Sequence, residues 1–215
     1  MEQYKSVLKE GSFEIEIKKS KFIGFAKPVE TEIEAQEFIA YIKKNNRNAN
    51  HNVPAYLIGL NNEIQKCSDD GEPSGSAGVP MLDLLRKEDL KNVVVVVTRY
   101  FGGIKLGVGG LVRAYTQTAK GALKESIIIE CKKMCKIKVI LEYSQYDKIE
   151  NLINKEELIV LDKEYSQDVE LIILINKEEV DEIKNRMINI CNGNIYTEVC
   201  GEDFYKISDR KVILD

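Results

Sequence analysis

Residues 66–115, KCSDDGEPSGSAGVPMLDLLRKEDLKNVVVVVTRYFGGIKLGVGGLVRAY, contain the features that decide the fold of this chain. Eight of its 14 glycines lie between Gly71 and Gly110, and five of these lie in the nine residues from Gly102 to Gly110. Glycine loses more conformational freedom on folding than any other residue. Such a density of glycine therefore indicates tight turns, or a backbone that must come close to another group.

Between the two glycine-rich segments lie residues 93–98, VVVVVT, a β-branched run without polar alternation. This pattern is typical of a strand buried on both faces. After the second segment, one helical face carries Leu111, Tyr115, Ala119 and Ala122, and another carries Arg113, Gln117, Lys120 and Lys124. We therefore expect a glycine-rich loop, a short helix, a buried strand, a second glycine-rich loop and a helix that ends near Glu125.

The length of 215 residues suits one large domain or two small ones. Hydrophobic residues at 44% and charged residues at 31% are typical of a globular protein in water. No apolar stretch approaches the roughly 20 residues that a membrane span needs, and residues 1–11 lack the apolar core of a secretory signal. We expect a cytoplasmic protein with no membrane partner.

The cysteines and the single histidine limit the chemistry. The five cysteines are an odd number without a C-x-x-C pair, so we expect reduced thiols, no metal and no cofactor. His51 is the only histidine, which excludes a His-rich zinc site. A triad of Ser74 or Ser76 with His51 and Asp70 can be written, but no nucleophile-elbow motif supports it.

Charge is distributed unevenly along the chain. Residues 1–130 hold 18 Lys and Arg against 17 Asp and Glu, whereas residues 131–215 hold 13 against 18. The net charge is therefore +1 in the first part and −5 in the second. A surface that binds a polyanion belongs in the first part.

The pattern of residues 1–130 predicts an α+β domain. Strands are expected at 13–17 and 21–29, then a helix to about residue 44 that starts at the capping-box sequence Thr31–Glu34. Residues 45–52, which include His51, read as a polar loop. Strands at 55–60 and 63–67 precede the glycine-rich segments.

The second part predicts a separate α+β domain over residues 134–215. Residues 127–135 read as a junction with an exposed link at Lys132 and Lys133, and alternation restarts at Ile137. A helix at 144–154, strands at 158–165 and 169–175, a helix capped by Asn176 and ended by Gly193, and a strand at 194–200 follow. This β-α-β-β-α-β order is the ferredoxin-like motif.

The two loops suggest different chemistry. Asp69, Asp70 and Glu72 are close enough in sequence to suggest an Mg²⁺ or Ca²⁺ site, or else a turn in which Asp and Ser side chains accept from loop N–H groups and Pro73 fixes φ. Residues 99–110 come off a buried strand and open a helix, where free N–H groups attract anions. The alternative for this second loop is a tight crossover whose glycines permit close packing.

Residues 68–115 resemble the signature of the IMPACT/YigZ family, in the segments SDDGEPSGSAGVPML and NVVVVVTRYFGGIKLGVGGLVRAY. The segments SKFI at 20–23, HN at 51–52 and AY at 55–56 also match the family pattern. Ser76 stands where threonine is common in the family. The resemblance extends over essentially the whole chain, because bacterial members carry a ferredoxin-like domain after the first.

The resemblance implies a first domain similar to a ribosomal small-subunit protein and to domain IV of elongation factor G. It implies a second domain similar to domain V of that factor. Both point to RNA and the ribosome. Eukaryotic relatives regulate translation initiation during amino-acid starvation through an additional N-terminal domain, so their protein partner is not expected to carry over.

We therefore expect a non-catalytic protein that binds RNA or a ribosome-associated surface and regulates translation. Its phosphate-binding residues would be Arg99, Gly102, Gly103, Lys105, Gly107, Gly109, Gly110 and Arg113. The cleft would be shaped by His51, Asp69, Asp70, Gly71, Glu72, Pro73 and Ser74. A metal-dependent hydrolase or phosphate-handling enzyme that uses Asp70, Glu72 and His51, and a protein-interaction module, stay open as alternatives.

Overall fold

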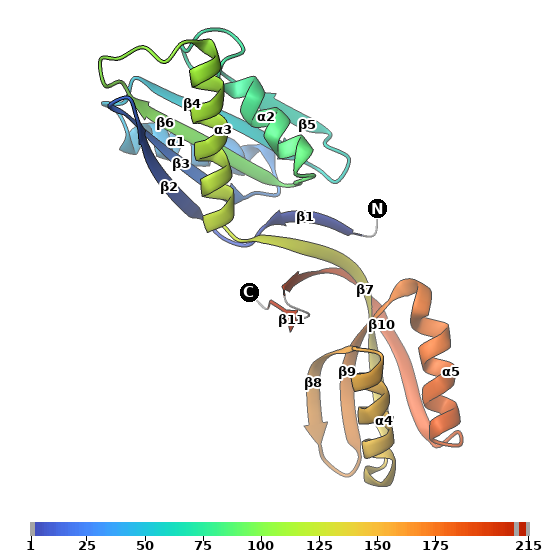
Figure 1. Ribbon diagram of the computed structural model, residues 1–215. Helices are drawn as coiled ribbons and strands as arrows, with labels where there is room; N and C mark the ends of the chain where they lie inside the picture. Colours follow the sequence, from blue (N-terminus) through green and yellow to red (C-terminus); the bar gives the residue numbers. More distant parts are fainter. Residues whose placement is uncertain (1–2, 209–210, 214–215) are drawn as a thin grey trace. The chain divides into compact units, whose positions relative to one another are not determined.

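The computed structural model describes residues 3–208 and 211–213. The chain forms two compact units, residues 3–130 and the residues from 131 onward, and each is an α+β domain with its own sheet and core (Figure 1).

The first unit is built on a five-stranded antiparallel sheet with β6 at its centre. In spatial order the strands are β2 (Gly11–Ile17), β3 (Ser20–Pro28), β6 (Val93–Tyr100), β4 (His51–Ile58) and β5 (Ile64–Cys67). A further strand, β1 (Gln3–Val7), forms a bridge to Leu90 through Lys5.

The valine run lies in β6 and has no exposed surface, because helices cover both faces of the sheet (Figure 1). Val93, Val95 and Val97 pack under α2 (Gly78–Lys87) and α3 (Val108–Glu125). Val94 and Val96 pack against α1 (Glu32–Asn45) on the opposite face. The prediction of a strand buried on both faces is therefore confirmed.

The start of α1 follows from its sequence. The Thr31 hydroxyl accepts from the Glu34 N–H at 3.2 Å, as the capping-box sequence predicts. The Glu34 carboxylate accepts from the Glu30 N–H at 2.9 Å, one residue before the position that the usual box would use. Ala35, Phe38 and Ile42 then form the buried stripe of the helix.

The predicted polar loop at residues 45–52 is wrong at its end, because β4 begins at His51. His51 pairs with Arg99 and Asn52 pairs with Thr98 in the antiparallel register of β4 and β6. The Thr98 hydroxyl donates to the Asn52 amide oxygen at 2.7 Å, which allows two polar side chains to be buried next to each other. Hydrogen bonding to the central strand thus keeps His51 and Asn52 in β4, although polar residues of this kind are typical of loops.

The second unit has the predicted β-α-β-β-α-β order. The order of strands across the sheet is β11 (Lys211–Val212), β10 (Ile195–Ser208), β7 (Ile128–Leu141), β9 (Val169–Asn176) and β8 (Ile159–Tyr165). Its core includes α4 (Tyr143–Lys155) and α5 (Val180–Ile190), the latter following the 3₁₀ turn η1 (Lys177–Glu179). The first strand lies between the last two of the four long strands in sequence, as in the ferredoxin-like motif.

The predicted junction at residues 127–135 contains the boundary between the two units, after Glu130, but the exposed link predicted there is wrong, because β7 runs without interruption from Ile128. Lys133 lies within this strand and pairs with Glu202 at 2.8 Å. Lys133, together with Lys177, lowers the pKa of Glu202 to about 2. The lysines that suggested an exposed link are therefore strand residues, and Lys133 has an acidic partner far along the chain. The predicted strand at 194–200 likewise extends further, to Ser208.

All five cysteines lie in the described part of the chain, and none of them is in a disulfide. Among the described residues, no helix combines the length and the apolar character that crossing a bilayer requires.

Helix α3 lies so close to the sheet that one position in β3 has no room for a side chain. A Cβ atom on Gly24 would lie 2.8 Å from the carbonyl oxygen of Thr118 and 3.1 Å from the Ala122 methyl group. We predict that Gly24→Ala lowers the free energy of unfolding by about 1–3 kcal/mol, because α3 must move off the sheet.

Chemical denaturation measures this loss. Gly109→Ala is the matched control, because it lies in α3 and a Cβ there meets nothing within 4 Å. That control should be neutral or stabilising by up to about 1 kcal/mol. Equal stability of Gly24→Ala and the wild type would contradict this account of the packing.

Candidate functional site

The candidate site lies at the end of the central strand, where Arg99 enters the core. Arg99 pairs with Phe22 of β3 on one side and with His51 of β4 on the other. Because alternate residues of a strand face the same way, Arg99 follows Val97 toward the side covered by α2 and α3. The whole residue is only 5% exposed, so its charge requires a buried partner.

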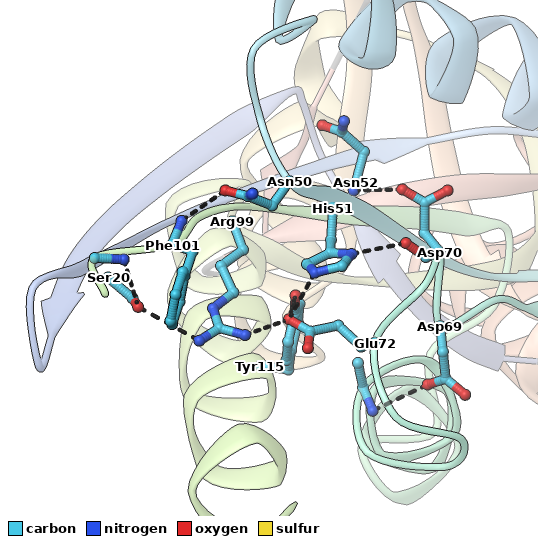
Figure 2. A network of polar contacts seen from close by, with 12 residues as sticks. Ser20, Asn50, His51, Asn52, Asp69, Asp70, Glu72, Arg99, Phe101 and Tyr115 are labelled. Carbon is cyan, nitrogen blue, oxygen red and sulfur yellow. Dashed lines mark hydrogen bonds and ion pairs between the residues drawn. The ribbon is translucent and has the colours of Figure 1, made fainter. Parts of the chain in front are cut away.

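That partner is Glu72 of the acidic loop. The Arg99 Nη1 lies 2.6 Å from the Glu72 Oε1, and the side chains are 6% and 4% exposed. The Tyr115 hydroxyl of α3 donates to the same Oε1 at 2.8 Å (Figure 2). Burial and the charge of Glu72 both raise the pKa of Tyr115, so the phenol stays protonated and acts as a donor. One carboxylate thus connects the acidic loop, the central strand and α3.

Arg99 also holds the second glycine-rich loop. Its guanidinium lies 5.3 Å from the Phe22 ring and 5.4 Å from the Phe101 ring. Its Nη2 donates to the Ser20 hydroxyl at 3.4 Å, and the same hydroxyl accepts from the Gly102 N–H at 3.2 Å. The Asn50 side chain accepts from the Phe101 N–H at 2.8 Å (Figure 2). The first residues of this loop are therefore fixed by the sheet.

His51 has a defined tautomer in its neutral form. Its Nδ1 lies 2.8 Å from the carbonyl oxygen of Asp70, and because a carbonyl only accepts, Nδ1 carries the proton. The Nε2 atom points toward Glu72, 3.8 Å from Oε1 (Figure 2). A Cβ atom on Gly71 would lie 3.4 Å from the His51 Nδ1, and the φ of Gly71 is +90°, so glycine suits this position.

The carboxylates of the acidic loop do not converge. Asp69 accepts from the N–H groups of Gly75, Ala77 and Gly78 at 2.7, 3.1 and 2.8 Å, and so caps the start of α2. Asp70 accepts from the Asn52 N–H at 2.6 Å and from the Lys43 ammonium at 2.7 Å. The described residues contain no cluster of three or more His, Cys, Asp or Glu that could hold a metal ion. The loop is therefore a capped turn.

The serines of this loop are not arranged as nucleophiles. Ser74 is exposed, whereas Ser76 is fully buried and its hydroxyl has no partner among the described residues. His51 contacts the Asp70 backbone and not its carboxylate. The geometry therefore provides no serine–histidine–carboxylate arrangement.

The glycines of the second loop have separate structural roles. A Cβ atom on Gly102 would lie 1.9 Å from the Lys19 carbonyl oxygen, so only glycine allows this close approach of two backbones. Gly103 and Gly107 have φ angles of +85° and +70°, which favour glycine. Gly110 packs against Leu106, whereas Gly109 has open space around its Cα.

A cavity of about 420 Å³ lies where the two loops meet. It is lined by Asn50, His51, Glu72, Pro73, Arg99, Phe101, Lys105, Leu106, Gly107, Val108 and Leu111. Helix α3 starts at this cavity without a side-chain cap, and its first bonded amide is that of Leu111, which donates to Gly107. The amides of residues 108–110 are thus the unpaired donors of a helix start.

Of the fifteen residues predicted for the site, six line this cavity: His51, Glu72, Pro73, Arg99, Lys105 and Gly107. Lys105 is exposed and lines the cavity, whereas Arg113 is exposed on α3 and does not line it. Asp69 and Asp70 hold the loop through the hydrogen bonds given above, and they do not line the cavity either.

Sequence reasoning missed the contributions of Asn50, Phe101 and Tyr115. One signal was present: Arg99 continues the alternation of Val93, Val95 and Val97 on a buried face, which demands a nearby carboxylate and further donors. The partners themselves come from distant loops, so no spacing in the sequence identifies them.

Comparisons with known proteins match both parts of the chain. Residues 18–123 match the model of the Impact N-terminal domain, and residues 139–194 match a domain of unknown function (DUF1949). The IMPACT family member YvyE of Bacillus subtilis (strain 168) is 45% identical over 193 residues, which cover 90% of this chain and 89% of the relative.

The IMPACT family member YigZ of Escherichia coli (strain K12) is 31% identical over 182 residues, which cover 84% of this chain and 89% of the relative. A solved structure described as "Crystal structure of an hypothetical protein" has 28% identity and a TM-score of 0.59, and the match covers 94% of this chain and 100% of that one. The resemblance predicted from the sequence is confirmed.

The buried ion pair predicts a large effect of one substitution. Glu72→Gln leaves the Arg99 charge without its counter-ion, and we expect a loss of about 3–5 kcal/mol in the free energy of unfolding. Chemical denaturation measures it, with Glu164→Gln on an exposed position of β8 as the matched control, which should change stability by less than about 0.5 kcal/mol. Equal stability of the two variants would show that the pair is not a constraint on the fold.

The cap on α2 predicts a pH dependence. Burial raises the pKa of Asp69, but hydrogen bonds from the amides of Gly75, Gly78 and Ala77 lower it more, so its net shift is downward. A carboxylate with a depressed pKa stabilises the fold fully above its unfolded-state pKa, and this contribution disappears as the pH falls through the folded-state pKa.

Asp69→Asn should therefore destabilise the protein at neutral pH, by about 1.5–3 kcal/mol for loss of the charge-assisted bonds. The difference from the wild type should shrink as the solution is acidified below about pH 4. Denaturation midpoints across the acid range test this, and a difference that is constant with pH would contradict it.

Proposed function

The chain belongs to the IMPACT family, and on that premise we propose that it binds RNA at the start of α3 and regulates translation without catalysing a reaction. The ligand is a phosphate of the RNA backbone, and its contact is the set of free amides of residues 108–110. This proposal requires neither a protein partner nor a particular oligomeric state.

The observation that carries the proposal is an uncapped helix start that opens on a cavity. Unpaired amides at the start of a helix carry partial positive charge, to which the dipole of the 18-residue α3 adds. No Asp or Glu lies within the first turn of α3 to occupy these donors. Lys105 lies on the rim and adds a full positive charge.

The apolar lining favours a nucleotide over a bare phosphate ion. The Phe101 side chain is 45% exposed although the Arg99 guanidinium lies 5.4 Å from its ring. Bases of single-stranded RNA stack on exposed aromatic rings of this kind. Leu106 and Val108 extend the apolar surface beside the ring.

Arg99 has a supporting role in this proposal. Its charge is neutralised by Glu72 at 2.6 Å, and its guanidinium holds Phe101 and the Ser20–Gly102 contact. Positive charge for the ligand then comes from the helix start and Lys105. Arg99 thus fixes the shape of the site, whereas the sequence alone suggested a direct phosphate contact.

Three variants test the cavity as an RNA site. Lys105→Ala should weaken binding of single-stranded RNA and lower the log–log salt slope by about 0.7. Phe101→Ala should lose about 1–3 kcal/mol of stacking for one base. Gly109→Val keeps the charge, and a Cβ there meets nothing within 4 Å, so we expect it to weaken binding by shielding the amides.

Fluorescence anisotropy with a labelled oligonucleotide measures all three, and Lys44→Ala on α1, across the sheet, is the charge-matched control. Failure of the wild type to bind any single-stranded RNA would refute the proposal. The role in translation is tested by co-sedimentation with ribosomes before and after nuclease treatment, and loss of ribosome association in Lys105→Ala but not Lys44→Ala would support it.

A further inference from the structure

We propose that the solvent face of α3 extends the cavity into a track for the phosphates of one RNA strand. This inference rests on the proposed binding of RNA at the start of α3. It adds a second contact region that the cavity does not include, formed by Arg113, Gln117, Lys120 and Lys124, which we call the α3 track.

The α3 track is a continuous stripe. Its residues are separated by four, three and four positions, and at 3.6 residues per turn they fall within an arc of roughly 60°. All four are exposed, whereas Leu111, Tyr115, Ala119 and Ala122 are buried against the sheet. From Arg113 to Lys124 the stripe extends over roughly 16 Å of helix, at a rise of 1.5 Å per residue.

The helix excludes acidic residues from this face. No Asp or Glu occurs between Val108 and Lys124, and the single acid of α3 is its last residue, Glu125. The chain as a whole has 35 acidic residues and a net charge of −4, so this segment differs sharply from its surroundings. By contrast, α1 on the other face of the sheet carries Glu32, Glu34 and Glu37. The positive face thus belongs to α3.

One carboxylate from outside α3 approaches the track. Glu88 lies 3.5 Å from the Lys120 ammonium, and the two side chains are 35% and 71% exposed. An exposed pair of this kind contributes little to stability, so a polyanion can displace it. Neither Arg113 nor Lys124 forms an ion pair with a carboxylate in the described part of the chain.

The track is continuous with the cavity. Gly109 is one helical turn before Arg113, and a Cβ atom there would meet nothing within 4 Å. No side chain at Gly109 therefore separates the free amides from Arg113, the first charged residue of the α3 track. A strand whose base stacks on Phe101 can follow this face with its phosphates, which favours a single strand over a duplex that keeps its bases paired.

The test compares two RNA lengths and two double variants. The track variant is Lys120→Glu with Lys124→Glu, and the control is Lys44→Glu with Lys155→Glu, which has the same net charge but changes α1 and α4. Single-stranded oligonucleotides of about 4 and about 16 nucleotides cover the usual range of site sizes. Affinity is measured by anisotropy at several salt concentrations, and thermal unfolding of each variant verifies that it is folded.

We expect the wild type to bind the longer RNA more tightly than the shorter one. The track variant should lose at least about tenfold in affinity for the longer RNA and about 1.4 in the log–log salt slope, because two phosphate contacts are removed. Its affinity for the shorter RNA should match that of the control. Arg113→Ala should weaken binding of the longer RNA without lowering the melting temperature.

Two results would overturn the track. One is equal affinity of the track variant and the control for the longer RNA, with binding of the shorter RNA intact, which leaves the cavity site standing. The other is binding of a poly-glutamate peptide as tightly as the longer RNA with the same dependence on Lys120 and Lys124, which identifies an acidic protein segment as the occupant. Absence of binding at both lengths in the wild type would refute the cavity site as well.

Discussion

Transfer of a carboxylate and a guanidinium from water to a protein interior costs several kcal/mol per ion, and Glu72 and Arg99 both bear that cost. Their contact at 2.6 Å is supported by the Tyr115 hydroxyl and by the Phe22 and Phe101 rings, which lie 5.3 and 5.4 Å from the guanidinium. Replacement of such a pair by apolar residues is often neutral for stability. The pair is better explained by what it positions, because it joins the acidic loop to the central strand and to α3, and so fixes both walls of the cavity.

The pair also decides where positive charge is available. Since Arg99 is neutralised, the contacts that we propose for an anion in the cavity are the backbone amides at the start of α3 and Lys105. Backbone donors are fixed by the helix and cost no side-chain entropy when a ligand binds. These amides do not change charge with pH, and the helix holds each of them at one position. The exposed charges of α3, by contrast, are mobile and screened by salt. In the proposed function, one helix therefore offers two kinds of contact to the same ligand, one local and directional, the other extended and dependent on ionic strength.

The sequence predicted the fold to a large extent because the decisive patterns are local. The valine run, the capping box at Thr31 and the alternation in the second unit each specify an element, and the order of elements then specifies the motif. The errors have a common cause. His51 belongs to β4 and Lys133 belongs to β7 because a neighbouring strand offers hydrogen-bond partners. The polar composition of these segments gives no sign of those partners. The site was predicted in part for the same reason: its glycines are local signals, whereas the link of Glu72 to Arg99 and Tyr115 spans 27 and 43 positions.

Helix α3 must pack closely on the sheet and also leave its backbone accessible at its start. Its sequence meets these two requirements on different faces and at different positions along the helix. Toward the sheet it needs small residues, since the Gly24 position leaves no room and a Cβ on Gly121 would meet the Phe13 ring. At its start it needs bare backbone, which Gly107, Gly109 and Gly110 provide at some cost in helix propensity. That cost is offset by burial of Tyr115, Ala119 and Leu123 against the sheet. Because the buried face holds the helix in place, its start need not carry a side-chain cap, and we propose that a ligand occupies the unpaired amides instead.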